Sequence, residues 1–375
     1  MDKEELIFTN VISKNHSGGS NCVESIVRIK NKIFNIESIY SIIEHIKWVN
    51  EKVERGSIKI LIESTSIADQ VIVLIFESII YHVLKNMNIS IKYRFNLQQN
   101  TIGYQCYKSS ILYKYNNCKI IKDKYIKEYE KNIIIDNNHY RKRCIRSEDK
   151  SQLSITMDEI ACFFRNLLLD EAYSEDLTEV IIEIIGNAVE HSESTCISSI
   201  NVLDSSGGKE KIIDVAIIDY SDIYLGTGME KYLESDSKHL YNERNRIVLE
   251  AYNNHKEFFS DLYVLKDFAM ISAFQKNVTS RINSPFTGGT GLTKLIKALI
   301  DKSTQNYCYV CSGETIIFFR RDFLNLTDDG LIGFNKENDY LNKIPNLEIV
   351  SRNLYNINVN AYNLQFIFKE NERNE

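Results

Sequence analysis

The sequence predicts an α+β protein in which a small α/β unit precedes a larger α/β sandwich domain, built from a mixed sheet with helices on one face. Residues 68–85 carry apolar side chains at helical spacing, and the flanking segments 58–63 and 89–95 have the patterns of short strands. Later alternating segments joined by glycine-containing turns predict hairpins at 195–219 and 307–319. Because strand–helix–strand units favour parallel pairing, both kinds of pairing are expected.

The composition is that of a globular protein with room for two domains. The chain has 375 residues, of which 43% are hydrophobic and 26% charged, and its net charge is −6. The acidic balance argues against a dedicated nucleic-acid binder, although it leaves room for a local basic patch. The first residues do not form a signal peptide and no apolar stretch is long enough to cross a bilayer, so we expect a soluble, cytoplasmic protein.

We expect three segments along the chain: an N-terminal α/β module at 1–150, a second domain at 151–325 and a C-terminal extension at 326–375. The boundary near 150 is indicated by the polar stretch 136–152. This stretch contains a basic cluster that we interpret as a solvated linker face, with contact to a nucleic acid or an acidic partner as the alternative; its members are Arg141, Lys142, Arg143 and Arg146.

A helix expected at 174–192 carries the first candidate site. Ser174 is expected to begin it, and its apolar stripe includes Ile181 and Ile184. Glu183 and Asn187 are four residues apart and therefore share a face. The carbonyl oxygen of Asn187 suits Mg²⁺, and a carboxylate one turn away could polarise a water molecule. The alternative is an ordinary amphipathic helix with a polar solvent face.

A glycine-rich segment running into a helix forms the second candidate site. It consists of Thr287, Gly288, Gly289, Thr290, Gly291 and Leu292. Backbone N–H groups that are free of side-chain obstruction at a helix start can bind phosphate, and Lys294 and Lys297 could add positive charge. The alternative is a generic glycine-rich turn.

Together these motifs resemble the GHKL family of ATP-binding proteins, which includes topoisomerase and mismatch-repair ATPases, chaperones, sensor histidine kinases and anti-sigma kinases. Glu183-Ile-Ile-Gly-Asn187-Ala188 matches the N-box of the family, Glu-x-x-x-Asn-Ala, and Gly289-Thr-Gly-Leu292 matches its second glycine box. Asp219 stands at the end of a strand, where the first glycine box of the family begins, but Ser221 replaces the glycine that follows. The resemblance covers residues 155–322.

The resemblance implies an ATP–Mg²⁺ site in which Asp219 contacts adenine, Glu183 is the general base and Asn187 is the metal ligand. The glycine segment would hold the phosphates, and residues 222–286 would form an unusually long lid over the nucleotide. The lid carries five candidate phosphate contacts: Lys238, His239, Arg244, Arg246 and Arg281. His191 is expected to cap the end of the N-box helix.

The implied activity is slow ATP hydrolysis that switches the conformation of the protein toward a protein partner or a second copy of itself. A non-hydrolysing nucleotide-sensing scaffold and an anti-sigma-type serine/threonine kinase are the alternatives. A sensor histidine kinase is disfavoured because no dimerisation hairpin with a phosphoacceptor histidine precedes the domain. The N-terminal module is loosely similar to a sulfate-transporter/anti-sigma-antagonist (STAS-like) domain, at the level of fold only.

Overall fold

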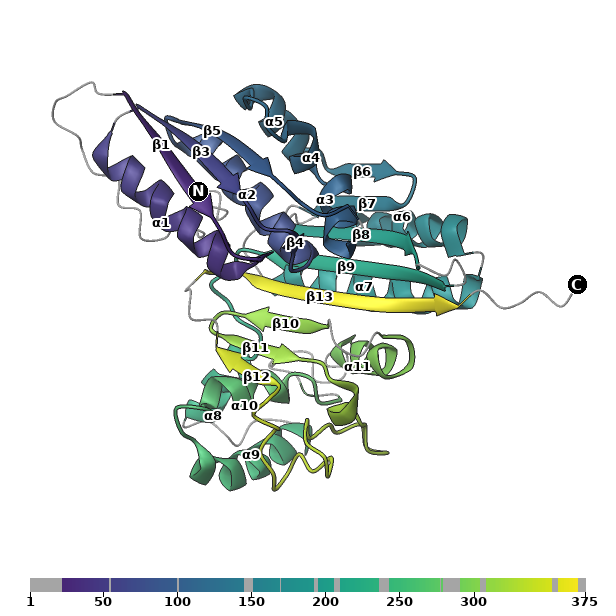
Figure 1. Cartoon of the computed structure of the whole chain (residues 1–375). Coiled ribbons are helices and arrows are strands. Elements are labelled where there is room, and N and C mark those ends of the chain that lie inside the picture. The colour runs from purple at the N-terminus through teal and green to yellow at the C-terminus, as the bar shows by residue number, and fades with distance from the viewer. Residues whose placement is uncertain are drawn as a thin grey trace, which may run out of the picture.

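The computed structural model describes most of the chain as helices and strands, and the described strands form three sheets (Figure 1). The described residues are 22–53, 55–99, 101–144, 151–168, 170–191, 195–205, 210–235, 243–276, 278, 291–303, 308–352 and 357–369. The mixed α/β class expected from the sequence is confirmed. None of the helices in these ranges is long and apolar enough to cross a membrane.

The N-terminal sheet is parallel, as the strand–helix–strand pattern predicts. It has the order β1-β3-β5, with β1 at Cys22–Ile29, β3 at Arg55–Ile62 and β5 at Ile89–Phe95. The helices α1 (Ile36–Lys52) and α2 (Gln70–Asn86) connect these strands. Each helix begins at a side-chain cap, Asn35 for α1 and Asp69 for α2.

Shorter elements complete this region. A small, two-stranded parallel sheet pairs β2 with β4. The short elements are β2 (Ile33–Phe34), β4 (Ser66–Ile67), α3 (Ile102–Ser109), α4 (Ile111–Tyr115) and α5 (Lys122–Tyr129).

The largest sheet has eight strands in the order β12-β11-β10-β13-β9-β8-β7-β6. Every neighbouring pair is antiparallel, whereas we expected a mixed sheet. The strands are β6 (Ile133–Asp136), β7 (His139–Cys144), β8 (Cys196–Asp204), β9 (Glu210–Asp219), β10 (Tyr309–Ser312), β11 (Thr315–Phe318), β12 (Val350–Arg352) and β13 (Asn360–Lys369).

This sheet draws strands from all three of the expected segments. β6 and β7 come from before residue 150, and β13 comes from the expected C-terminal extension but lies between β9 and β10 in the sheet. The expected boundaries at 150 and 325 therefore do not coincide with the boundaries of the sheet. The C-terminal strand is a central part of the larger domain, since its two neighbours each pair with it along one edge.

The expected linker at 136–152 is wrong for the residues of β7. All six side chains of β7 are buried, including Arg141, Lys142 and Arg143. Lys142 Nζ lies 2.8 Å from a carboxylate oxygen of Glu159, and Arg141 faces Glu77. Charged residues are buried here because other elements supply partners, so Arg141–Arg143 are not free to meet a nucleic acid. Arg146 lies outside the described residues.

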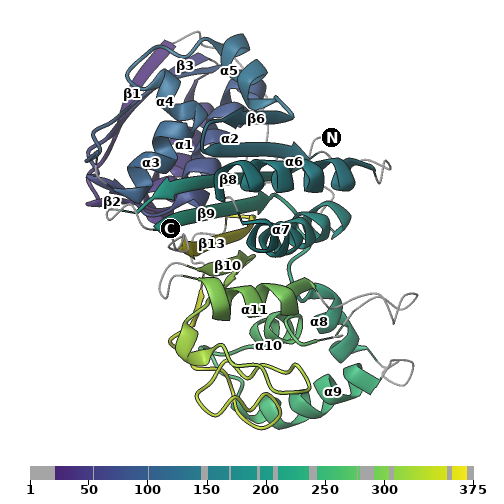
Figure 2. The ribbon, with the colours of Figure 1, turned by 90° about the vertical axis from the view of Figure 1, so that its right-hand side faces the viewer.

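One face of the eight-stranded sheet is covered by α6 (Ser151–Leu168), α7 (Glu171–His191) and α11 (Gly291–Lys302), as Figure 2 shows from the side. Their apolar side chains join those of alternate sheet residues such as Val215 and Ile217 in one core. α7 begins three residues earlier than expected. Asp170 caps it by accepting from the Tyr173 N–H, and Ser174 lies inside the first turn.

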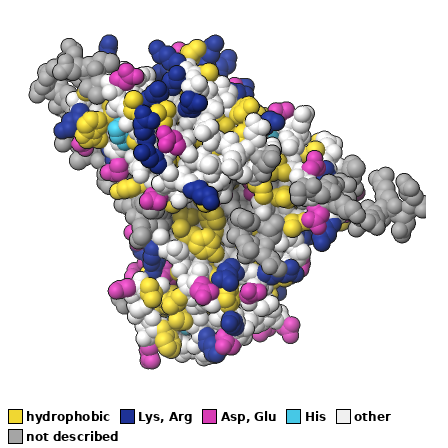
Figure 3. Space-filling view, in the orientation of Figure 1, with side chains coloured by type: hydrophobic (Ala, Val, Ile, Leu, Met, Phe, Trp, Pro, Cys, Tyr) yellow, Lys and Arg dark blue, Asp and Glu magenta, His cyan; other side chains and the backbone are white. Residues whose placement is uncertain are grey.

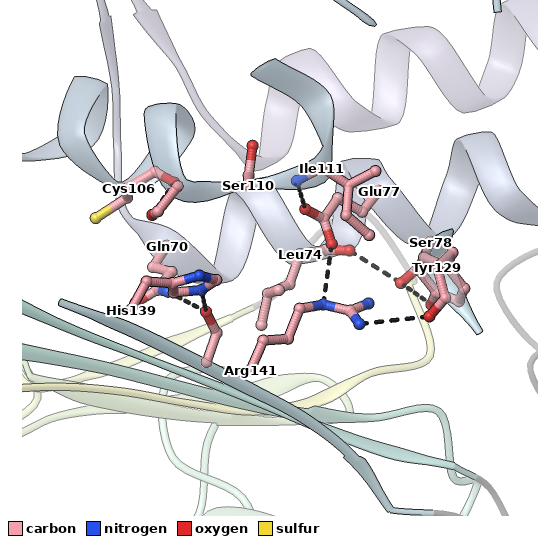
Figure 4. Close-up of polar contacts among 12 residues, drawn as sticks. Gln70, Leu74, Glu77, Ser78, Cys106, Ser110, Ile111, Tyr129, His139 and Arg141 are labelled. Carbon is pink, nitrogen blue, oxygen red and sulfur yellow. Dashed lines mark hydrogen bonds and ion pairs between the residues drawn. The ribbon is translucent and has the colours of Figure 1, made fainter. Parts of the chain in front are cut away.

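The other face is covered by the N-terminal region, mainly by α2 and α3, so helices lie on both faces rather than one. The side chains of α2 from Gln70 to Leu84 are all buried. The contact includes several polar side chains, some of which Figure 4 shows: Gln70 hydrogen-bonds Ser199, Cys106 Sγ donates to Asp214, and Glu77 faces Arg141. The two regions are therefore joined by a buried polar layer.

Much of the segment expected as a lid is a packed helical layer. It contains α8 (Thr227–Glu234), α9 (Glu243–His255) and α10 (Leu265–Ser272), with a 3-10 turn at Lys256–Phe258. This layer contacts residues 326–352: His255 hydrogen-bonds the Tyr340 carbonyl at 3.0 Å, and Arg352 forms a bidentate ion pair with buried Asp267. A second 3-10 turn, Arg321–Phe323, leads from β11 into residues 326–352.

Candidate functional site

Glu183 and Asn187 lie one turn apart on α7, as the spacing predicts. Both are half-buried, and they flank the buried residues Ile184 and Ile185 on the helix. Neither side chain makes a hydrogen bond or an ion pair with another described residue. The two polar groups are thus held at the edge of the core with their hydrogen-bonding capacity unused by the described chain.

Two ion pairs fix the direction of α11 against α7. Lys302 Nζ lies 2.6 Å from Asp176 Oδ2, and Lys294 contacts Glu179. The C-terminal end of α11 therefore lies near the start of α7, and the Gly291 end is directed toward Glu183. Lys294, expected to add charge for a phosphate, has its ammonium group beside Glu179 instead, because the two helices run antiparallel.

The glycine segment is described only at its last residues. Thr287, Gly288, Gly289 and Thr290 lie outside the described residues, whereas Gly291 begins α11 and Leu292 is buried in the core. Thr293 follows in the first turn, and its hydroxyl is buried without a hydrogen-bond partner in the described part of the chain. A buried hydroxyl of this kind was not singled out from the sequence, where a threonine in a helix has no distinguishing pattern.

Asp219 lies on the same side of the sheet as α7. Side chains alternate along β9, so Asp219 shares a face with Val215 and Ile217, which pack into the core formed with α7. Asp219 is opposite Cys196, the first residue of β8, and Cys196 follows the end of α7 by five residues. Asp219, the second half of α7 and the start of α11 are thereby brought to one end of the domain.

The Asp219 carboxyl group is buried and its hydrogen bonds go to one oxygen. Oδ1 accepts from the Ser221 N–H at 3.1 Å and from Asn360 Nδ2 at 3.0 Å, while Oδ2 accepts none from a described residue. Burial raises the pKa of Asp219 to about 7, and the two hydrogen bonds act in the opposite direction. The group is poised to change its protonation near neutral pH.

Ser221, which replaces a glycine of the family pattern, closes a defined turn after Asp219. Its Oγ accepts from the Ile223 N–H at 3.0 Å, and its side chain is buried. The Ser221 N–H and hydroxyl thus both stabilise the turn. The later Gly226 caps α8 with φ of +92°, and its Cα lies against the backbone of Ala269. Both the backbone angle and the close contact require glycine at this position, which is in another part of the fold.

Asn360 is a site residue that sequence reasoning missed. It begins β13 opposite Asp219, and besides Asp219 its Nδ2 donates to the Ile223 carbonyl at 3.0 Å. Its Oδ1 accepts from Ser312 Oγ, which in turn accepts from the Leu225 N–H at 2.7 Å. One amide therefore holds together the ends of three strands and the turn after Asp219.

The expected cationic contacts from the lid are mostly outside the described residues. Lys238, His239 and Arg281 are not described, nor are the side chains of Arg244 and His191. Arg246 is exposed on α9. The structure brings none of these groups to the site as a described contact.

Comparisons with protein families, with curated proteins and with solved structures find no match to this chain. Over the described ranges, no three His, Cys, Asp or Glu side chains are grouped as a metal site would require.

Proposed function

We propose that this protein binds ATP with Mg²⁺ where Asp219 and the second half of α7 meet, in the manner of the GHKL family. The position of Asp219 carries the proposal. Its carboxyl group lies on the α7 side of the sheet at the last residue of β9, and Oδ2 accepts no hydrogen bond from the described chain. In its ionised form the group is a fixed acceptor in a buried position, and its unused oxygen offers a partner to the amino group of adenine.

The residues on the neighbouring helices suit the rest of the nucleotide. The amide oxygen of Asn187 is a hard ligand of the kind that Mg²⁺ takes, and Gly291 begins a helix directed toward Glu183. Backbone N–H groups at that helix start, with the buried Thr293 hydroxyl, would bind phosphate oxygens. When bound, Mg²⁺ would neutralise charge on the phosphates.

Glu183 is suited to hold a water molecule for attack on the terminal phosphate. Its carboxylate is one turn from Asn187 and has no ion-pair partner among the described residues, so it is free to accept a proton from water. The reaction proposed is slow ATP hydrolysis.

The N-terminal region supports a role for the nucleotide as a conformational switch for a protein partner. β9 carries Asp219 on the nucleotide side and Asp214 on the other side, where the Asp214 carboxylate accepts from Cys106 at 3.0 Å. A shift of β9 on nucleotide binding would therefore change contacts with α3. Movement of all of 222–286 would break the ion pair between Asp267 and Arg352. The proposed switch therefore acts through β9 and leaves this pair intact.

The hydrolysis test is phosphate release from ATP with Mg²⁺ by the wild type, by Glu183→Ala and by Glu175→Ala, at an exposed residue of α7, as the matched control. We expect slow release by the wild type, a loss of about 100-fold or more in Glu183→Ala, and near-normal release in the control. Equal, nonzero rates in the wild type and Glu183→Ala would remove Glu183 as the base. Binding of ATP without release by the wild type would favour the non-hydrolysing scaffold.

A further inference from the structure

The N-terminal sheet ends at a strand whose outer edge has no partner in the described part of the chain. β1 is the terminal strand of the order β1-β3-β5 and pairs only with β3. Its eight residues are long enough to offer a full row of backbone donors and acceptors. Such an edge readily pairs with a strand of another molecule.

The side chains of β1 that face away from α1 form a self-complementary set. Glu24, Ile26 and Arg28 alternate on this face and are all exposed, and Ile26 is 49% exposed. Arg28 lies 3.5 Å from Glu63 of its own chain, and both side chains of this pair stay about half exposed, so Arg28 can also face a partner. An acidic residue, an apolar residue and a basic residue thus follow one another at equal spacing on one face of an open edge.

We propose that two copies of this chain associate through antiparallel pairing of their β1 strands, with the twofold axis at Ile26. In this register Glu24 of each copy lies opposite Arg28 of the other, and the two Ile26 side chains meet on the axis. Opposite charges directly across an antiparallel pair are stabilising, and a twofold interface requires this kind of self-complementarity. The proposal goes beyond nucleotide binding and does not depend on it.

The neighbouring registers are less favourable. Centring the pair on Ser25 places Glu24 opposite the partner's Ile26, and centring it on Val27 places Arg28 opposite the partner's Ile26. Either shift loses both Glu24–Arg28 pairs and separates the two Ile26 side chains. Centring the pair on Val27 brings Glu24 opposite the partner's Lys30, but that residue lies beyond the end of β1. Within β1, the register centred on Ile26 pairs both charged residues and the apolar residue.

The opposite side of β1 adds a second apolar group beside the edge. Ser25 faces α1, where its hydroxyl is 3.0 Å from His45 Nε2. The His45 ring lies 5.6 Å from that of Trp48, which is 48% exposed. Pairing of the two edges would bring the partner's β1 close to this tryptophan and reduce its exposure. Apolar side chains on both sides of the edge would thus lose contact with water.

The outer face of the sheet offers a competing explanation that the same experiment tests. Basic side chains gather over this upper part of the molecule (Figure 3), including Lys59 on β3 and Lys92 and Arg94 on β5. An acidic partner bound to that basic face would use β3 and β5 as well as β1. It would not depend on the order of charges along β1.

The test is sedimentation of the full-length wild type over a range of concentrations, with charge reversals on β1. We expect a wild-type dimer, and association weaker by about tenfold or more for Glu24→Arg or Arg28→Glu, because each single change places like charges opposite each other twice. The double variant Glu24→Arg/Arg28→Glu should recover dimerisation, since it exchanges the charges. Arg94→Glu, on the far strand, is the control and should leave the dimer unchanged.

A cross-link fixes the register independently. Directly opposite residues in an antiparallel pair have Cα atoms about 4.5–5.5 Å apart, within disulfide range. Ile26→Cys should give a disulfide-linked dimer on mild oxidation, whereas the wild type, with its eight cysteines, and Ile33→Cys should not. Any of three results would overturn the proposal. The wild type could stay monomeric at tens of micromolar, the double variant could associate no better than the single reversals, or Ile33→Cys could cross-link as much as Ile26→Cys.

Discussion

Asn360 Nδ2 donates a hydrogen bond to Asp219 Oδ1 at 3.0 Å, and both residues are buried. This bond joins the first residue of β13 to the last residue of β9, 141 positions apart in the chain. It ties the proposed adenine contact to the C-terminal strand. The geometry of that contact therefore depends on a part of the chain that we had expected to be an appendage.

Removing the Asn360 amide should destabilise the protein and raise the pKa of Asp219 further. In Asn360→Ala, Asp219, the Ile223 carbonyl and Ser312 each lose a buried partner, and we expect a loss of about 2–3 kcal/mol in the free energy of unfolding. Urea unfolding measures the loss. Asn254→Ala, at an exposed asparagine, should change stability by less than about 1 kcal/mol; equal effects of the two changes would contradict this role for Asn360.

The raised pKa of Asp219 predicts a pH dependence of stability. The folded protein keeps this proton up to about pH 7, whereas the unfolded chain loses it near 3.8, the ordinary pKa of an aspartic acid. Between these values the folded state binds more protons, so stability falls as pH rises, by about 1.4 kcal/mol per pH unit for one group. Asp219→Asn should remove this part of the slope in unfolding curves between pH 4.5 and 7. An unchanged slope would show that the group titrates normally.

The buried pair between Glu77 and Arg141 predicts unequal effects of single and double substitutions. Arg141 Nε lies 3.5 Å from Glu77 Oε2, both side chains are 1% exposed, and the Ile111 N–H donates to Glu77 Oε1 (Figure 4). Arg141→Met leaves the Glu77 charge buried alone and should cost about 3–5 kcal/mol in the free energy of unfolding. Adding Glu77→Gln should restore most of the loss, since the amide still accepts from Ile111. A double variant as unstable as Arg141→Met would contradict this account.

Truncation of the C-terminal strand should unfold the larger domain rather than trim it. β13 pairs with β9 along ten residues and with β10 along four, and it contributes Leu364 and Phe366 to the core. A chain ending at Ile357 should lose cooperative thermal unfolding, because the sheet is interrupted at its centre. Circular dichroism during heating measures this; a truncated protein that melts cooperatively near the wild-type temperature would show that β13 is dispensable.

The sequence predicted features that depend on local pattern. The helical stripe at 68–85 became α2, and the spacing of Glu183 and Asn187 placed both on one face of α7. The strand that ends at Asp219 was also predicted, because alternation before a polar turn is a local property. These parts of the candidate site follow from periodicity alone.

Features that depend on distant partners were not predicted. Three consecutive charged residues, Arg141 to Arg143, resemble a linker until Glu77 and Glu159 are brought to them by α2 and α6. Asn360 has no local pattern that connects it to Asp219, since strand order is decided by which edges pair in space. Sequence periodicity gives the face of a residue but not its neighbour across a sheet.

The most direct test of the central claim is isothermal titration of ATP with Mg²⁺ into the wild type, Asp219→Asn and Asp214→Asn. The two aspartates are buried on opposite faces of β9, so Asp214→Asn is a matched control on the side away from α7. We predict binding by the wild type and by Asp214→Asn, and affinity lower by about tenfold or more in Asp219→Asn. No binding by the wild type, or equal affinity in all three proteins, would contradict the account.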